Sequence, residues 1–226
     1  MMYTDPSGHS WFSKLWKKVK KYIKTIAAIA IAAVIAVYAP GLLSTYMGIV
    51  KGTLASAVAT GALAGFASGA IMTGSLEGAL QGALWGAGSA GVAFGVGETL
   101  GHAGGIFTKG VKSGQAFIKA AAHGLSRGII SMAQGGTFKS GFASGFSASF
   151  FSPGTTMGGD GAGGFGLRTS IAAIAGGTAS ALGGGKFANG AISGAFVHMF
   201  NAEAKAYLIK NRQTLAWNQT KEAALA

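Results

Sequence analysis

The stretch TIAAIAIAAVIAVYAPGLLSTYMGIV, residues 25–50, decides the fold of this chain. It carries no formal charge over the 26 residues that separate Lys24 from Lys51. The hydrocarbon core of a bilayer is about 30 Å thick, and about 20 consecutive apolar residues in an α-helix cross it. The stretch is therefore long enough for a membrane span. Pro40 should break or kink the helix, because proline lacks a backbone N–H donor and clashes with the preceding turn.

Beyond this stretch, as far as residue 108, glycine recurs at every fourth position. Residues four apart share one face of an α-helix, and glycine there lets two backbones approach closely and gain dispersion contacts. Each glycine costs about 0.5–1 kcal/mol relative to alanine in a helix, so close packing has to offset that cost. The alternative is a flexible or irregular Gly/Ala-rich segment, since 40 glycines in 226 residues produce some such spacings by chance. The expected helix-packing faces are Gly61, Gly65 and Gly69; Gly74, Gly78, Gly82 and Gly86; and Gly97, Gly101 and Gly105.

The composition argues against a free-standing soluble domain. Hydrophobic residues make up 50% of the chain and charged residues 11%, whereas soluble domains have about 25% charged residues. The mean hydropathy of +0.43 agrees with this. With no cysteine, a disulfide framework, a thiol nucleophile and a thiolate metal site are all excluded.

The basic residues are concentrated directly before the apolar stretch. The net charge is +12, and six of the 18 basic residues lie between residues 14 and 24. From Trp11 to Ile26, apolar residues follow three- and four-residue steps while lysines mostly take the other side, which is typical of a basic amphipathic helix at a membrane interface. Lysines beside a span attract anionic headgroups by about 1 kcal/mol each, which favours lipid over nucleic acid. The expected lipid-binding residues are Lys14, Trp16, Lys17, Lys18, Lys20, Lys21 and Lys24.

By composition the chain divides into five segments. They are a polar, turn-rich start (1–10), the basic amphipathic helix (11–24), the apolar glycine-zipper membrane region (25–108), a Gly/Phe-rich helical region (109–200) and a polar amphipathic tail (201–226). The fourth segment contains two similar stretches, 131–152 and 180–200, which we interpret as an internal duplication. We predict a mainly α fold of glycine-zipper helical hairpins or a bundle, membrane-seeking, with glycine-rich loops and little or no β-structure.

Two acidic residues, Glu77 and Glu98, lie inside the apolar region. An ionisable side chain within a membrane costs about 2.5–3.5 kcal/mol on insertion scales and often marks a pathway for ions. Both glutamates are therefore candidate pore-lining residues or triggers of pH-gated insertion. The alternative is that both sit at helix ends or in loops that water reaches.

The titratable residues show no catalytic spacing. Only six acids and four histidines occur, no two acids lie close in sequence, and the spacings of zinc ligands or of a metal-dependent nuclease are absent. The motif G-x-G-x-x-G occurs at residues 161–166, but no predicted strand precedes it, as a dinucleotide site would require. We therefore expect no enzyme activity, no catalytic residue, no bound metal and no cofactor.

The first residues and the two similar stretches carry a family resemblance. Residues 3–8, YTDPSG, look like the closing motif of the Rhs/YD-repeat core of bacterial polymorphic toxins, with Asp5, Pro6 and Gly8 at the junction. Residues 122–153 and 176–201 are similar to glycine-rich modules of the C-terminal regions of such proteins. The chain thus resembles the C-terminal toxin or pre-toxin region of an Rhs effector.

This resemblance implies a secreted antibacterial effector that is delivered to a target cell, with an Rhs cocoon and a cognate immunity protein as partners. The residues themselves then indicate the kind of activity, which is insertion into the inner membrane, as a homo-oligomer, and its permeabilisation or depolarisation. Only 25 residues follow Asn201, so we expect no enzymatic domain there. The main rival is a non-catalytic translocation or packing module for a toxin missing from this chain. An enzyme built from scattered residues, such as a phospholipase or a nuclease, is the other.

Overall fold

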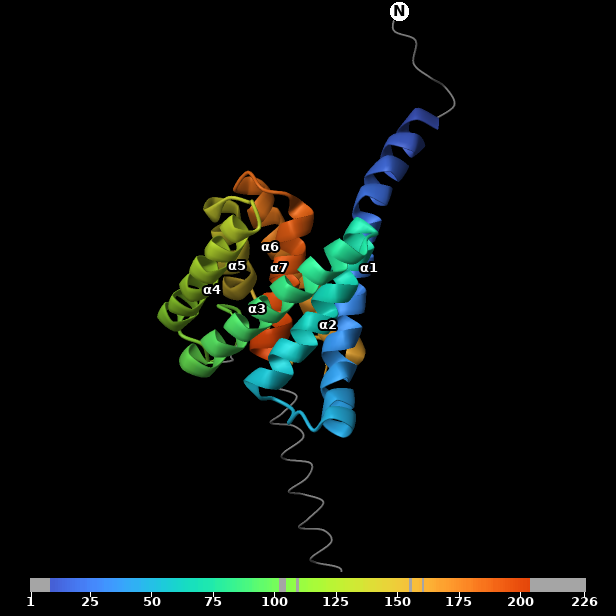
Figure 1. Cartoon of the computed structure of the whole chain (residues 1–226). Coiled ribbons are helices and arrows are strands. Elements are labelled where there is room, and N and C mark those ends of the chain that lie inside the picture. Colours follow the sequence, from blue (N-terminus) through green and yellow to red (C-terminus); the bar gives the residue numbers. More distant parts are fainter. Residues whose placement is uncertain (1–8, 102–104, 109, 155, 160, 204–226) are drawn as a thin grey trace, which may run out of the picture.

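The computed structural model describes residues 9–101, 105–108, 110–154, 156–159 and 161–203, with side chains described from residue 22 onward. Within these ranges the chain is helical and contains no strand, which confirms the mainly α prediction (Figure 1). The helices are α1 (His9–Met47), α2 (Leu54–Thr73), α3 (Leu76–Leu100), α4 (Ser113–Ala133), α5 (Phe138–Phe150), α6 (Ala162–Leu182), α7 (Phe187–Val197) and the π-helical turn η1 (His198–Glu203).

Helix α1 joins the basic and the apolar segment in one element of 39 residues. Its first half projects away from the other helices, and its second half runs beside α2 (Figure 1). The prediction that Pro40 breaks the helix was wrong, because α1 continues through Pro40 to Met47. Only one i−4 hydrogen bond is lost at a proline, and neighbouring turns carry the helix past it.

Helices α2 and α3 form an antiparallel hairpin. Thr53 caps α2 and Ser75 caps α3, each by accepting a hydrogen bond from the backbone N–H three residues on, which satisfies one free donor of the first turn. Gly74, with a φ of +73°, ends α2 because glycine adopts the left-handed conformation without strain. The connection between the two helices is therefore only two residues long.

Two further hairpins, α4–α5 and α6–α7, repeat each other at a spacing of 49 residues. Helices α4 and α6 are both 21 residues long, and they begin at Ser113 and Ala162. Both connections turn through a glycine with positive φ, Gly135 at +76° and Gly184 at +86°. The repeat also holds for sequence identities, namely Gly128/Gly177, Ser131/Ser180, Gly135/Gly184, Gly136/Gly185, Phe138/Phe187, Gly141/Gly190, Ser144/Ser193 and Gly145/Gly194.

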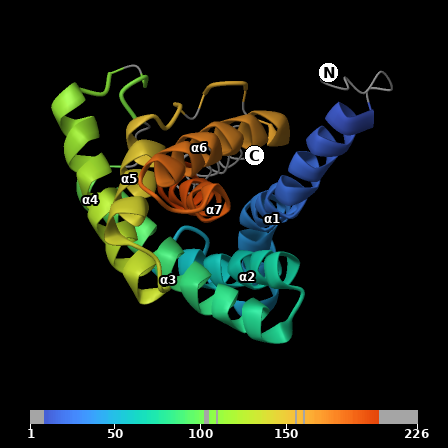
Figure 2. The same cartoon turned by 90° about the horizontal axis from the view of Figure 1, so that it is seen from above.

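The same packing joins the two helices of each repeated hairpin. The Phe138 ring lies over Gly128, and the Phe187 ring lies over Gly177. In both cases a Cβ atom on the glycine would come within 3 Å of the ring. The phenylalanine at the start of the second helix therefore needs the glycine on the first. Helix α7 continues into η1, which packs against α3 and α6; Figure 2 shows α7 between α6 and the α2–α3 hairpin.

Candidate functional site

The distribution of apolar side chains is inverted relative to a soluble protein. Of the 21 buried apolar residues, 15 are alanine. Large apolar side chains are instead outside: 29 of them are exposed, distributed over all seven α-helices except α7. Soluble monomers rarely expose contiguous apolar patches above a few hundred Å², whereas small residues between helices and large ones outside are typical of packing in lipid. The outer surface is therefore the first candidate functional site.

Helix α1 contributes an unbroken share of this surface. Ile26, Val34, Tyr38, Leu42 and Tyr46 are all more than half exposed. Residues 22–47 of α1, and α2 over its whole length, are long and apolar enough to cross a membrane. The described part of the chain thus contains two helices that permit membrane association.

The expected lipid-docking residues lie at the first half of α1. Lys24 is exposed. The others belong to α1 but their side chains lie outside the described residues; these are Lys14, Trp16, Lys17, Lys18, Lys20 and Lys21. The junction residues Asp5, Pro6 and Gly8 also lie outside the described part of the chain.

The first glycine series meets part of the second across the α2–α3 hairpin. Gly61 faces Gly86, Gly65 faces Gly82, and Gly69 faces Gly78. A Cβ atom on Gly61, Gly65 or Gly69 would overlap the backbone of the facing glycine. The two backbones are therefore in direct contact along about three turns.

Three glycines of the expected series do not pack helices in this way. Gly74 ends α2 and faces open space, and Gly101 follows α3 with a φ of +93° and also faces open space. Gly105 lies in the loop, where its N–H donates to the carbonyl oxygen of Ser152 at 2.7 Å. Their assignment to helix faces was wrong, because a four-residue spacing continues through a helix end that left-handed glycine creates. Gly97, the first of that series, is buried within α3.

The two candidate pore-lining glutamates lie at opposite ends of α3. Glu77 is exposed in the first turn, where the helix dipole favours an acid, and its Oε1 accepts a hydrogen bond from Gln81 Nε2 at 3.2 Å. Glu98 is exposed in the last turn. This placement matches the alternative that both sit at helix ends.

A row of buried basic side chains runs along α4. Lys119, His123 and Arg127 are four residues apart and 4%, 1% and 6% exposed. Burial lowers the pKa of Lys119 to about 8 and that of Arg127 to about 10. Burial, and then the charges of Lys119 and Arg127, lower the pKa of His123 to about 3. His123 is therefore neutral in the folded chain at neutral pH, and its Nε2 lies 2.5 Å from Asn201 Nδ2.

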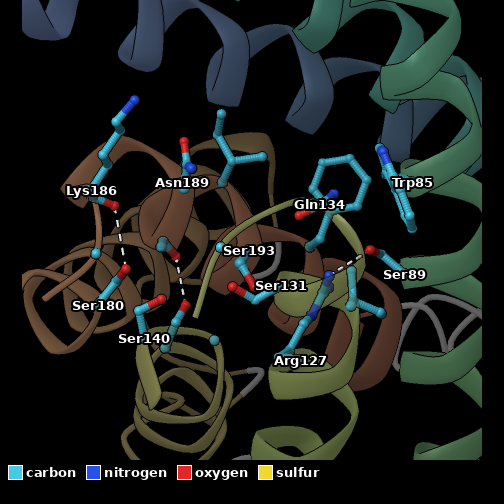
Figure 3. Close-up of a pocket in the computed structure, with 18 of the residues that line it drawn as sticks. Trp85, Ser89, Arg127, Ser131, Gln134, Ser140, Ser180, Lys186, Asn189 and Ser193 are labelled. Carbon is cyan, nitrogen blue, oxygen red and sulfur yellow. Dashed lines mark hydrogen bonds between the residues drawn. The ribbon is translucent and has the colours of Figure 1, made fainter. Parts of the chain in front are cut away.

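Arg127 reaches a polar cavity of about 620 Å³ between the three hairpins. Figure 3 shows Ser131, Ser140, Ser180 and Ser193 around it, with Trp85 at one edge. Its lining contains many glycines and hydroxyls, two basic residues, Arg127 and Lys186, and no acid. The cavity is thus an electropositive, hydrogen-bonding space within a small-residue core.

A second buried network joins the end of the chain's described part to the α5–α6 connection. Arg168 donates from Nε and, at 3.1 Å, from Nη2 to the carboxylate of Glu203, and from Nη1 to the carbonyl oxygens of Met157 and Gly159 at 2.6 and 2.8 Å. His198 Nε2 lies 3.1 Å from Glu203, and its Nδ1 lies 2.8 Å from Ser152 Oγ.

This network has the residue types of a Ser–His–acid triad but not its access. Ser152, His198 and Glu203 are each at most 8% exposed, and none of them lines the polar cavity or the apolar groove between α1, α6 and α7. Arg168 satisfies the acid, and the serine bonds the ring nitrogen opposite to the one a nucleophile uses. The network therefore holds η1 and the loop in place.

Sequence reasoning missed the buried basic row and the Arg168–Glu203 pair. A signal for the first was present, since Lys119, His123 and Arg127 at four-residue spacing share one helix face. Nothing in the sequence pairs Arg168 with Glu203. Comparison with known protein families, with curated proteins and with solved structures finds no match for this chain.

Proposed function

We propose that this chain is a membrane-permeabilising module, the C-terminal region of an Rhs-type antibacterial effector that inserts into the inner membrane of a target cell and depolarises it. The activity is physical and needs no catalytic residue. Membrane lipids are its first partner, and a second copy of the chain joins it after insertion. The cocoon and the immunity protein remain implied by the family resemblance.

The observation that carries this proposal is the inverted distribution of side chains. An alanine-rich interior contributes little hydrophobic free energy in water, because burial is worth about 25 cal/mol per Å² of apolar area and alanine has little area to bury. In lipid the hydrophobic drive between helices is absent and close packing dominates. A bundle with small residues inside and large ones outside is therefore better suited to lipid than to water.

Three features suggest the order of events. The basic half of α1 projects from the bundle (Figure 1), where anionic headgroups can reach it. The apolar half of α1 then inserts, since its exposed side chains already face outward. The α2–α3 hairpin follows as a unit, because its backbones are in contact and its outer face carries Leu63, Phe66, Leu80 and Leu84.

Release from pure lipid vesicles tests the proposal. The full chain is added to vesicles of phosphatidylethanolamine and phosphatidylglycerol that hold a self-quenched dye and a potassium gradient. We expect dye release or loss of the membrane potential without any added substrate. A chain that co-sediments with these vesicles but leaves both dye and potential intact would instead be the translocation or packing module. Release that coincides with lipid hydrolysis products would indicate an enzyme.

A further inference from the structure

The cavity between the hairpins contains a buried cation that the proposed membrane activity does not use. Arg127 is 6% exposed and donates from Nη1 to Ser89 Oγ at 2.5 Å. Its other terminal nitrogen, Nη2, is buried and has no hydrogen-bond partner among the residues that the structure describes. A buried guanidinium group with an unused donor and no facing acid is unfavourable, and an anion in the cavity would remove that deficit.

Further donors surround the guanidinium group. Ser89, Ser131 and Ser193 line the cavity, and none of their hydroxyls donates to another residue in the described part of the chain. The side-chain amides of Gln134 and Asn189 also line it (Figure 3). The burial of the lining gives the cavity a direction: Arg127 and Ser89 are buried at its floor, and the two turns at its mouth are exposed.

The repeated hairpins build this cavity from equivalent positions. Ser131 and Ser180, Ser144 and Ser193, and the two turn glycine pairs all line it, each 49 residues from its counterpart. The cation breaks this symmetry. The counterpart of Arg127 is Gly176, where a Cβ atom would lie 2.6 Å from the carbonyl oxygen of Gly190. The cavity therefore has one anchor, not two.

We propose that this cavity binds a phosphoryl group, with the guanidinium group of Arg127 as its anchor and the hydroxyls of Ser89, Ser131 and Ser193 as further donors. A planar guanidinium group holds phosphate oxygens through paired N–H donors. A phosphate monoester carries a charge of about −1.5 to −2 at neutral pH and offers three acceptor oxygens. It thus matches the two positive charges of Arg127 and Lys186 better than a carboxylate does. The pKa of Arg127, at about 10, keeps this side chain protonated at neutral pH.

Equilibrium dialysis of the full chain in detergent micelles against radiolabelled inorganic phosphate tests this assignment. We expect saturable binding of one phosphate per chain. Arg127→Lys keeps the charge but loses the paired donors, and should weaken binding at least tenfold. Lys186→Gln changes an exposed residue at the mouth and should weaken it several-fold without a folding defect. Lys112→Gln removes the same charge from an exposed residue outside the cavity and should leave binding within twofold of the wild type.

A second arm distinguishes the source of the phosphoryl group. Vesicles of phosphatidylcholine with phosphatidic acid, whose headgroup is a phosphate monoester, are added as competitor, with pure phosphatidylcholine vesicles as control. Competition by phosphatidic acid alone indicates a lipid headgroup, and its absence indicates a free phosphorylated compound; either outcome supports a phosphoryl site. Non-saturable binding, an adventitious ion only, would overturn the proposal. Equal weakening by Lys112→Gln and Lys186→Gln would also overturn it. Dye release measured without phosphate reports on the membrane activity separately.

Discussion

Gly65 of α2 and Gly82 of α3 lie in reciprocal backbone contact: a Cβ atom on either one would overlap the carbonyl oxygen of the other. Two other glycines of α3, Gly88 and Gly95, face open space. The same helix therefore contains glycines that packing requires and glycines that it does not. This contrast separates a glycine interface from a merely glycine-rich composition.

Alanine at these two kinds of position should change stability in opposite directions. Gly65→Ala and Gly82→Ala should each lower the free energy of unfolding by at least 1–3 kcal/mol, roughly the cost of overpacking, because a backbone cannot move aside as a side chain can. Gly88→Ala and Gly95→Ala should raise it by about 0.4–1 kcal/mol, since alanine restricts the unfolded chain. Thermal unfolding in detergent micelles measures both, and equal signs would show that the glycine contacts do not matter.

Leucine at the same positions connects packing to activity. Gly65→Leu with Gly82→Leu separates the backbones and should abolish dye release while membrane binding persists. The matched pair Gly88→Leu and Gly95→Leu adds the same apolar area on the open side and should retain release. Co-sedimentation and release are measured on each variant. Release retained by the first pair would remove the hairpin interface from the mechanism.

The basic half of α1 should govern membrane binding. Replacing Lys14, Lys17, Lys18 and Lys21 with glutamine should weaken binding to anionic vesicles by about 4 kcal/mol at low salt, at roughly 1 kcal/mol per charge, and by less at high salt. Partitioning into phosphatidylglycerol vesicles is the measurement. The control removes equal charge elsewhere, through Lys51, Lys112, Lys139 and Lys186. A similar loss in that control would mean that only net charge acts.

Acid should destabilise the fold through His123. Its pKa is about 3 when folded, against an ordinary value of 6.5, so its neutral form is favoured by folding. This contribution is fully present above about pH 6.5 and is lost as the pH falls toward 3. Between pH 6.5 and about 4.5 the expected loss is about 2–3 kcal/mol, at roughly 1.4 kcal/mol per unit. His123→Gln cannot titrate, so its unfolding free energy should vary less over this range; an unchanged slope would exclude His123 as the cause.

The buried pair of Arg168 and Glu203 should behave as a unit. Replacing either residue alone with methionine leaves its partner charged and buried, which should cost about 3–5 kcal/mol. The double variant should cost less than the sum by about 1–3 kcal/mol, and additivity would show that the residues do not interact. Burial raises the pKa of Glu203, but the bonds with His198 and Arg168 outweigh it and hold this pKa below 4.5. The contribution of Glu203 therefore persists above about pH 4.5 and is lost only at lower pH.

The sequence alone determined the helical class and the preference for a membrane. Helical periodicity and the scarcity of charge are local properties, visible in residues 25–50 and in the series from Gly61 to Gly69. The same spacing also predicted which face of α2 packs, because residues four apart share a face in any α-helix. Sequence further marked the similarity of 131–152 to 180–200, although not the registration of α4 with α6.

Only the tertiary structure decided which faces meet and where each helix ends. Gly74 and Gly101 follow the predicted spacing, yet a left-handed backbone places both outside helices. The pairing of Gly65 with Gly82, the burial of Arg127 beside Ser89 and the bond of Arg168 to Glu203 join residues 17 to 38 positions apart. Such contacts depend on how hairpins dock and on which polar groups lose water together, and neither quantity is encoded in a local period.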